Sequence, residues 1–160
     1  MDNQKLKEII ERYENFHFNV VKKAEAIIKT EIGEELTKDQ HAVLRYVKTN
    51  GSCTASELAK AFFVKKSAIT AIINRLTEKN MITRCRDHND RRVVYLSMTD
   101  YGEKIYKRCN ENINALVVSL VSQFKQDEIE AFLNTYEKLD RILDQQINKA
   151  LKGVNNEIHT

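Results

Sequence analysis

Four arginines lie close together in the middle of the chain, on both sides of a polar segment. Arg84 and Arg86 precede the segment 87–91, and Arg91 and Arg92 stand at its end. A guanidinium keeps its charge and is attracted by the enhanced negative potential of a narrow minor groove of DNA. The pattern therefore indicates a basic arm that contacts nucleic acid.

A second group of residues, upstream of the arginines, fits the outward face of a DNA-reading helix. Ser, Thr and Asn side chains hydrogen-bond base edges or phosphates, Ala contacts a thymine methyl, and Lys and Arg neutralise phosphates. The residues that we expect to bind DNA are Lys65, Lys66, Ser67, Thr70, Ala71, Asn74 and Arg75 on this helix, together with Arg84, Arg86, Arg91 and Arg92.

Asp90 is the one residue of this region that argues against phosphate binding if its carboxylate is free. It directly precedes Arg91 and Arg92, and a free carboxylate there would repel a phosphate group. We therefore interpret Asp90 as an internal partner that orients an arginine or ties the arm to a neighbouring basic side chain.

Positive charge is confined to the middle third of the chain. Residues 52–99 contain nine Lys and Arg against four Asp and Glu, although the whole chain has a net charge of only +3. Residues 1–51 are balanced and residues 100–160 are net acidic. Such segregation is typical of a phosphate-facing module held between neutral or acidic elements.

Long amphipathic helices are expected on both sides of this basic region. Apolar residues recur every three or four positions from Leu6 to Ile27, which predicts a helix that ends at Gly33. Two more such helices follow the capping signal Thr99-Asp100. Their apolar rows are Ile105, Cys109, Ile113, Leu116, Leu120 and Phe124, and then Ile129, Phe132, Tyr136, Leu139, Leu143 and Ile147.

Shorter elements are expected between the long helices. Thr37 with Gln40, and Thr54 with Glu57, have the spacing of capping boxes, so a helix should begin at each. A third helix over 66–79 should end at a left-handed Asn80. Its apolar face, which would anchor the reading helix, consists of Ile69, Ile72, Ile73 and Leu76.

The period then changes from helix to strand. Residues 81–86 and 92–98 read as two strands around the polar turn 87–91. A hairpin that follows three helices and is tipped with arginines is a winged helix. The predicted fold is therefore mainly α with a small β-hairpin wing, a winged helix-turn-helix flanked by long N- and C-terminal dimerisation helices.

The long helices have too little of their own domain to pack on, which favours a two-fold homodimer. We expect a dimerisation region over 1–33 and 103–152, a winged DNA-binding lobe over 34–102, and a disordered tail over 153–160. Intramolecular bundling of the long helices without a partner is the alternative.

A resemblance to a known family is carried by a series of short motifs. These are Leu58-Ala59, then Val64-x-x-Ser67-x-Ile69-Thr70, Arg75-Leu76-x-x-x-Asn80-Met81-Ile82, Asp90-Arg91-Arg92 and Met98-Thr99-x-x-Gly102. In this order and spacing they resemble the MarR (multiple antibiotic resistance regulator) family. The resemblance implies a homodimeric repressor whose two winged lobes bind a pseudo-palindromic operator. It also implies that the helix from Lys66 enters the major groove and that Arg92 enters the minor groove.

Three positions depart from the family pattern. Asn80 replaces a Gly after the reading helix, which is conformationally mild. Phe63 stands where the helix-turn-helix turn usually has Gly, so Phe63 must avoid the left-handed conformation or accept strain. Lys65 replaces a capping Ser and loses a cap worth about 1 kcal/mol.

The resemblance further implies release from DNA by a small apolar or phenolic ligand, or by cysteine oxidation. We expect a ligand pocket at the junction of the dimerisation region and the lobe, although aromatic rows at this spacing are usually core. Its residues would be Tyr13, Phe16, His17, Tyr46 and Tyr101. The first helix has no cysteine, which weakens the oxidation mechanism; Cys109 is the remaining candidate for it, and its position in an apolar row favours a core role.

Other classes find little support. The three cysteines, Cys53, Cys85 and Cys109, are widely spaced without a CxxC pair, so we expect reduced thiols and no metal or other cofactor. His17, His41 and Glu34 or Glu35 lack the helical spacing of a zinc site. Cys53 with His41 is a weak enzyme alternative, and a helical protein-interaction module is another. With neither signal peptide nor membrane segment, the expected location is the cytoplasm.

Overall fold

The computed structural model describes residues 2–157, with side chains up to Lys149. It separates into two compact units, residues 1–115 and 116–160. The first contains α1 (Asn3–Ile32), α2 (Lys38–Asn50), β1 (Cys53–Thr54), α3 (Ala55–Ala61), α4 (Lys66–Glu78), β2 (Ile82–Arg86), β3 (Val94–Met98) and the first part of α5 (Asp100–Val121). The second contains the end of α5 and α6 (Gln126–Glu157). The chain is therefore mainly helical with a small sheet, as the sequence predicts.

The helices begin where the capping signals predict. Thr37 accepts a hydrogen bond from the Gln40 backbone N–H at 3.2 Å, and the Gln40 side chain accepts one from Thr37 N–H at 3.1 Å. Thr54 and Glu57 form the same reciprocal pair at the start of α3. Each capping box satisfies two backbone donors that the first turn leaves without partners.

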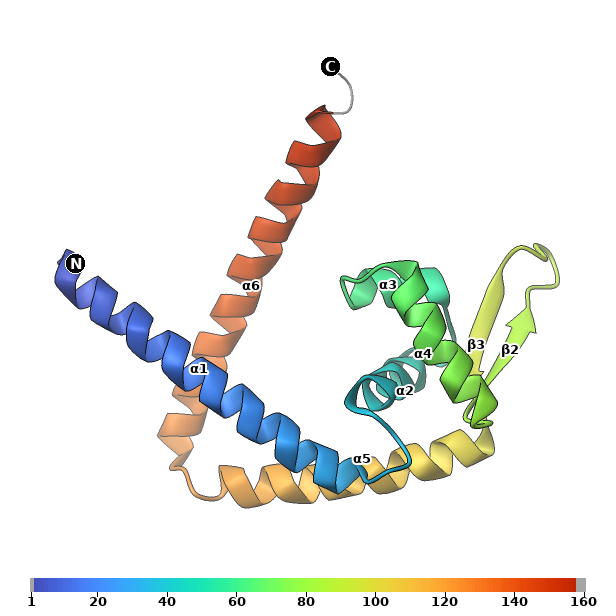
Figure 1. The fold of residues 1–160 in the computed structure, drawn as a ribbon, viewed down its shortest axis with the longest axis horizontal. Coiled ribbons are helices and arrows are strands. Elements are labelled where there is room, and N and C mark those ends of the chain that lie inside the picture. Colours follow the sequence, from blue (N-terminus) through green and yellow to red (C-terminus); the bar gives the residue numbers. More distant parts are fainter. Residues whose placement is uncertain (1, 158–160) are drawn as a thin grey trace. The chain divides into compact units, whose positions relative to one another are not determined.

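The sheet has one strand more than the sequence predicts. β3 pairs with β2 along its whole length and with the two-residue β1 on its other side, in the order β1-β3-β2. In this register Arg84 lies opposite Leu96, and Arg86 lies opposite Val94. Figure 1 shows the hairpin of β2 and β3 beside α4.

One apolar core holds the lobe together. It contains the predicted anchor residues of α4, with Ile69, Ile73 and Leu76 at most 2% exposed and Ile72 packed at its edge. Val43, Leu44 and Val47 of α2 and Leu58 of α3 are equally buried. Cys109 of α5 is also a core residue at 2% exposure, which confirms the structural reading of its apolar row. The core thus fixes α4 and leaves its opposite face free.

Two non-glycine residues adopt left-handed backbone conformations. Asn80 has φ 56° and follows Lys79, the C-cap residue of α4, which confirms the predicted left-handed conformation at the end of the helix. Phe63 has φ 53° in the turn between α3 and α4. Of the two possibilities left open by the sequence, the turn therefore keeps its left-handed shape and Phe63 accepts the strain. Lys65 provides no side-chain cap to α4, as expected.

The second unit is almost entirely one helix with its connecting turn. α6 runs to Glu157, and residues 158–160 lie outside the described part. The disordered tail expected over 153–160 stays a prediction. Within the described residues, no helix is both long and apolar enough to cross a membrane.

Candidate nucleic-acid interface

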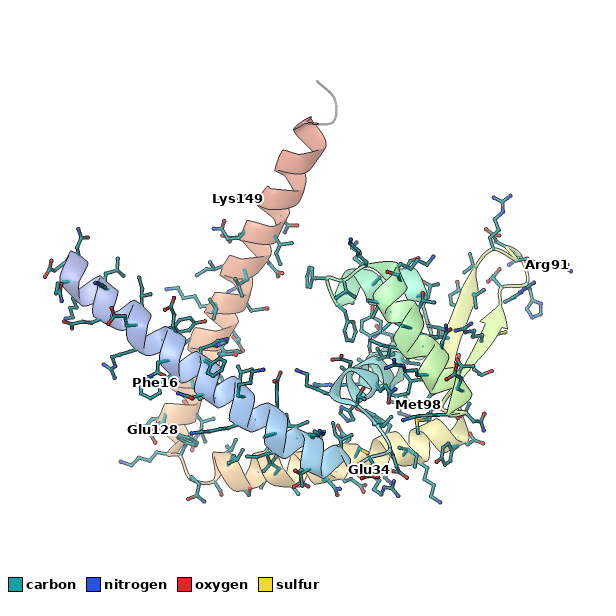
Figure 2. The ribbon with its side chains drawn as sticks, viewed as in Figure 1. Phe16, Glu34, Arg91, Met98, Glu128 and Lys149 are labelled. Atoms are coloured by element: carbon teal, nitrogen blue, oxygen red, sulfur yellow. The ribbon has the colours of Figure 1, made fainter. Side chains whose placement is uncertain are left out.

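All eleven residues expected to bind DNA are exposed, and they come from two neighbouring elements. Seven lie at the start or along the outer side of α4, and the other four lie on the hairpin of β2 and β3 or its loop, which we call the wing (residues 82–98). Figure 2 shows Arg91 at the far end of the wing, pointing away from the strands. The structure thus brings the two predicted groups onto adjacent elements.

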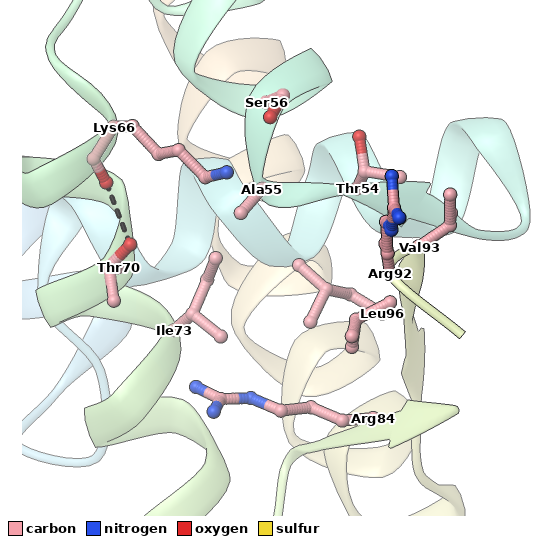
Figure 3. A pocket seen from close by; sticks show the side chains of 11 residues that line it. Thr54, Ala55, Ser56, Lys66, Thr70, Ile73, Arg84, Arg92, Val93 and Leu96 are labelled. Carbon is pink, nitrogen blue, oxygen red and sulfur yellow. Dashed lines mark hydrogen bonds between the residues drawn. The ribbon is translucent and has the colours of Figure 1, made fainter. Parts of the chain in front are cut away.

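An open groove of about 450 Å³ separates α4 from the wing. Lys66, Arg84 and Arg92 supply its charge, Thr54, Ser56 and Thr70 supply hydroxyls, and no carboxylate is found among the described residues that line it. Figure 3 shows Lys66 and Arg84 extending into this region from opposite sides. Three cations without an anion in the same lining create a positive potential that suits a phosphate.

Thr54 and Ser56 also line this groove, although neither was expected from the sequence to contact DNA. The sequence feature that could have pointed to them is the capping box of Thr54 and Glu57. It places both hydroxyls at the start of α3, beside α4 and the wing. Glu57 accepts hydrogen bonds from the Thr54 backbone and hydroxyl, and these hydrogen bonds lower the pKa of Glu57.

The wing loop is held by two aspartates. The Asp87 carboxylate accepts hydrogen bonds from the backbone N–H groups of Asn89 and Asp90, at 2.7 and 2.8 Å. Asp90 accepts one from the backbone N–H of Arg92 at 2.9 Å. Asp90 thus accepts a hydrogen bond from the backbone of Arg92 within the wing loop. This leaves the Arg92 side chain free to reach the groove. That Asp90 orients an arginine side chain or ties the wing to a neighbouring basic side chain stays a prediction.

Arg84 differs from the other wing arginines because its guanidinium is already engaged. Its Nη2 atom donates to Oδ1 of Asn74 on α4 at 2.5 Å. Strand alternation places Arg84 on the same face as the buried Ile82, and this face is turned toward α4. The contact therefore ties the wing directly to the reading helix.

The five aromatic and histidine residues of the expected ligand pocket occupy separate surroundings. Tyr13 and His17 stack on α1 at 5.4 Å between ring centroids, and Phe16 is exposed beside them. Tyr46 packs edge-on against Phe62 at 6.1 Å. Tyr101, in the first turn of α5, is 46% exposed. A pocket shared by all five residues stays a prediction.

The thiol and histidine weighed as an enzyme alternative are both buried. Burial, with a smaller contribution from Glu57, raises the pKa of Cys53 to about 11, which makes it a poor nucleophile at neutral pH. Among the described residues, no group of three His, Cys, Asp or Glu side chains is arranged to hold a metal ion.

Comparisons with known proteins identify the group to which this lobe belongs. The family model described as "MarR family" matches residues 36–94, which include α2, α3, α4 and β2. The HTH-type transcriptional regulator YpoP of Bacillus subtilis is 30% identical over 118 residues, which make up 71% of this chain and 84% of the relative. The chain belongs to the MarR family. It is thus a transcriptional regulator, as the resemblance of its motifs predicts.

Two further matches extend this assignment. The HTH-type transcriptional repressor MdtR of Bacillus subtilis is 35% identical over 94 residues, or 59% of this chain and 61% of the repressor. The crystal structure of a mutant MarR from E. coli complexed with operator DNA has a TM-score of 0.73. That match covers 87% of this chain and 99% of the other at 24% identity, so it supports the MarR fold alone.

Proposed function

We propose that this MarR-family regulator binds double-stranded DNA through α4 and the wing, and that it represses transcription. The observation that carries this proposal is the groove whose described lining contains Lys66, Arg84 and Arg92 and no carboxylate. The exposed Ser67, Thr70 and Ala71 on the first turns of α4 provide groups that can read base edges. The similarity to the repressor MdtR supports repression as the outcome of binding.

The major groove of B-DNA admits one α-helix, and α4 is held from behind by its buried face. Its outer face would then lie against the bases, with Lys65, Lys66 and Arg75 beside the phosphates. The wing would follow the neighbouring minor groove, where Arg91 and Arg92 meet the strongest negative potential.

We further propose that the active species is a homodimer, whose subunits meet through their long helices. On α1, Tyr13, Phe16 and Phe18 are each about 60% exposed. On the end of α5 and on α6, Val118, Phe132 and Tyr136 are exposed to a similar degree. A second copy that covers such apolar rows removes them from water, and this burial contributes roughly 25 cal/mol of favourable free energy per Å² of apolar surface. The expected dimerisation region over 1–33 and 103–152 agrees with this distribution.

A small apolar or phenolic ligand that releases the DNA belongs to the same proposal. Tyr13, Phe16, His17, Tyr46 and Tyr101 are the residues that we assign to its pocket. Ligand binding there would weaken operator binding by favouring a different arrangement of the lobes.

DNA binding is tested first by selecting duplexes from a random pool and measuring affinity for the selected sequence by fluorescence anisotropy. A dimer with two reading helices predicts half-sites about 10 bp apart. Arg92→Ala should weaken binding about tenfold. It should also reduce the slope of log affinity against log salt concentration by about one, the value expected for the loss of one phosphate contact. Lys107→Ala removes the same charge from an exposed position on α5 that the proposal leaves off the DNA, so it should bind like the wild type. If Arg92→Ala binds unchanged, the wing assignment is wrong.

The homodimer is tested by sedimentation at several protein concentrations. The chain has a mass of 18.6 kDa, and we expect a species of twice that mass. Val118→Glu, at a position 68% exposed on α5, should shift the equilibrium toward the monomer because the charge would be buried in the interface. Asn134→Glu, at a polar position of α6, is the matched control. A wild-type monomer at micromolar concentration would contradict the proposal.

A further inference from the structure

The hydrogen bond from Arg84 to Asn74 determines which part of the Asn74 side chain is available to a base. Arg84 Nη2 lies 2.5 Å from Asn74 Oδ1, and both side chains are exposed beside the groove. A guanidinium has only donors, so the atom of Asn74 that faces Arg84 must be the carbonyl oxygen. Chemistry therefore fixes the orientation of this amide.

Nothing else competes for the guanidinium in the surroundings that the structure describes. The ion pairs formed by the described residues do not include Arg84. A hydrogen bond to a charged donor is roughly twice as strong as one between neutral groups. Ile82 is buried on the same face of β2 and Leu96 is buried opposite Arg84, so the strand that carries Arg84 is held in the core.

An asparagine with a free amide reads adenine by a pair of hydrogen bonds. Its Oδ1 accepts from the adenine N6 amino group, while its Nδ2 donates to N7. In this protein Oδ1 already accepts from a cation, and the positive charge beside it opposes the approach of a base amino group. Oδ1 keeps a second lone pair, but it lies beside the guanidinium charge, so the Nδ2 group, which only donates, is the part of the amide best placed to meet a base.

We infer that Arg84 is a specificity-determining positioning residue that converts Asn74 from an adenine reader into a hydrogen-bond donor. Asn74 then favours guanine, through O6 and N7, and thymine, through O4. Adenine is disfavoured because its one acceptor in the major groove, N7, lies beside the N6 amino group, whose approach the Arg84 charge opposes. Through Arg84 the wing thereby affects which base α4 prefers in the major groove, although the proposed binding mode places the wing tip in the minor groove. This inference rests on the proposed DNA binding of α4.

The experiment compares the sequences that four proteins select from a random duplex pool: the wild type, Asn74→Ala, Arg84→Ala and the double variant. One position in each half-site should favour guanine or thymine with the wild type. Asn74→Ala should flatten that position and leave the others. Arg84→Ala should shift the same position toward adenine by on the order of tenfold. The double variant should match Asn74→Ala there, because Arg84 acts through Asn74.

Each result separates the inference from its alternatives. If Arg84 only supports the fold or contacts a phosphate, Arg84→Ala weakens binding to all sequences and its position-by-position preferences stay those of the wild type. That outcome overturns the inference, as does a wild-type preference for adenine at the Asn74 position, or no effect of Asn74→Ala on any position. If the wild type enriches no duplex, the proposed function itself has failed. Thermal unfolding of all four proteins verifies that each is folded.

Discussion

Gly102 lies so close to the backbone of Met81 that a Cβ atom at Gly102 would overlap the Met81 carbonyl oxygen and lie 2.9 Å from its carbonyl carbon. The same carbonyl accepts a hydrogen bond from the Thr99 N–H at 3.1 Å, and the Thr99 hydroxyl donates to the Asn80 carbonyl at 2.7 Å. The first turn of α5 is therefore seated on the chain that leaves α4. These contacts explain in physical terms the Thr and the Gly of the Met-Thr-x-x-Gly motif that follows the wing.

Gly102→Ala should lower the free energy of unfolding by about 1–3 kcal/mol, because the backbone of α5 or of Met81 must move to admit the methyl group. Urea unfolding followed by circular dichroism measures the change. Lys104→Ala, at an exposed position in the same turn, should unfold at nearly the wild-type midpoint. Equal midpoints for both variants would show that the contact is not close in solution.

Phe63→Gly should stabilise the protein. Phe63 is 71% exposed and has φ 53°, so it contributes little burial and has a left-handed penalty of roughly 1 kcal/mol. Glycine removes the penalty, in part offset by the greater freedom of the unfolded chain. Asn80→Gly is the matched control at φ 56°, and it should gain less because asparagine tolerates this conformation. The melting temperatures should rank Phe63→Gly above Asn80→Gly; the reverse order would contradict the strain at Phe63.

The features that sequence predicted well are those with local signals. The caps at Thr37 and Thr54, the end of α4 at Asn80 and the buried face around Ile69 each depend on residues within one or two helical turns. Their physical causes, the unsatisfied N–H groups and the helical period, are written in neighbouring residues.

The features that sequence missed depend on contacts between distant residues. The strand β1 is only two residues long and exists because β3 offers it an edge. The Lys79 ammonium donates to the Glu35 carbonyl at 2.6 Å, across 44 positions of the chain. Arg84 was expected to contact DNA, and its hydrogen bond to Asn74 required the register of the hairpin. No short pattern records such pairings.

His41 should make stability fall on mild acidification. It is 9% exposed, stacks on Tyr106, and its Nε2 atom is buried without a hydrogen-bond partner among the described residues. Burial first, and the positive charge of Arg45 second, lower the pKa of His41 in the folded state. The unfolded chain then binds the proton more tightly. The free energy of unfolding is therefore unaffected by His41 above the unfolded pKa of about 6.5. It decreases as the pH falls from there toward the folded pKa.

The measurement is the urea midpoint between about pH 7 and pH 5 for the wild type and for His41→Phe, which keeps an aromatic ring beside Tyr106. The variant should have a shallower pH dependence over this range, whatever its absolute stability. His88→Gln, on the wing loop, should keep the wild-type slope. An unchanged slope in His41→Phe would contradict the assignment.

The three cysteines should react at very different rates. Cys85 on β2 is exposed, whereas Cys53 and Cys109 are 3% and 2% exposed. Burial raises the pKa of both buried thiols, that of Cys53 to about 11, so that about one Cys53 in a thousand is a thiolate at pH 8. A thiol reagent that absorbs on reaction should therefore modify one group per folded chain rapidly and all three after denaturation. Cys85→Ser should abolish the rapid phase, and Cys109→Ser should retain it. A rapid phase that persists without Cys85 would mean that the core opens readily, and it would return Cys109 to consideration as an oxidation-sensitive group.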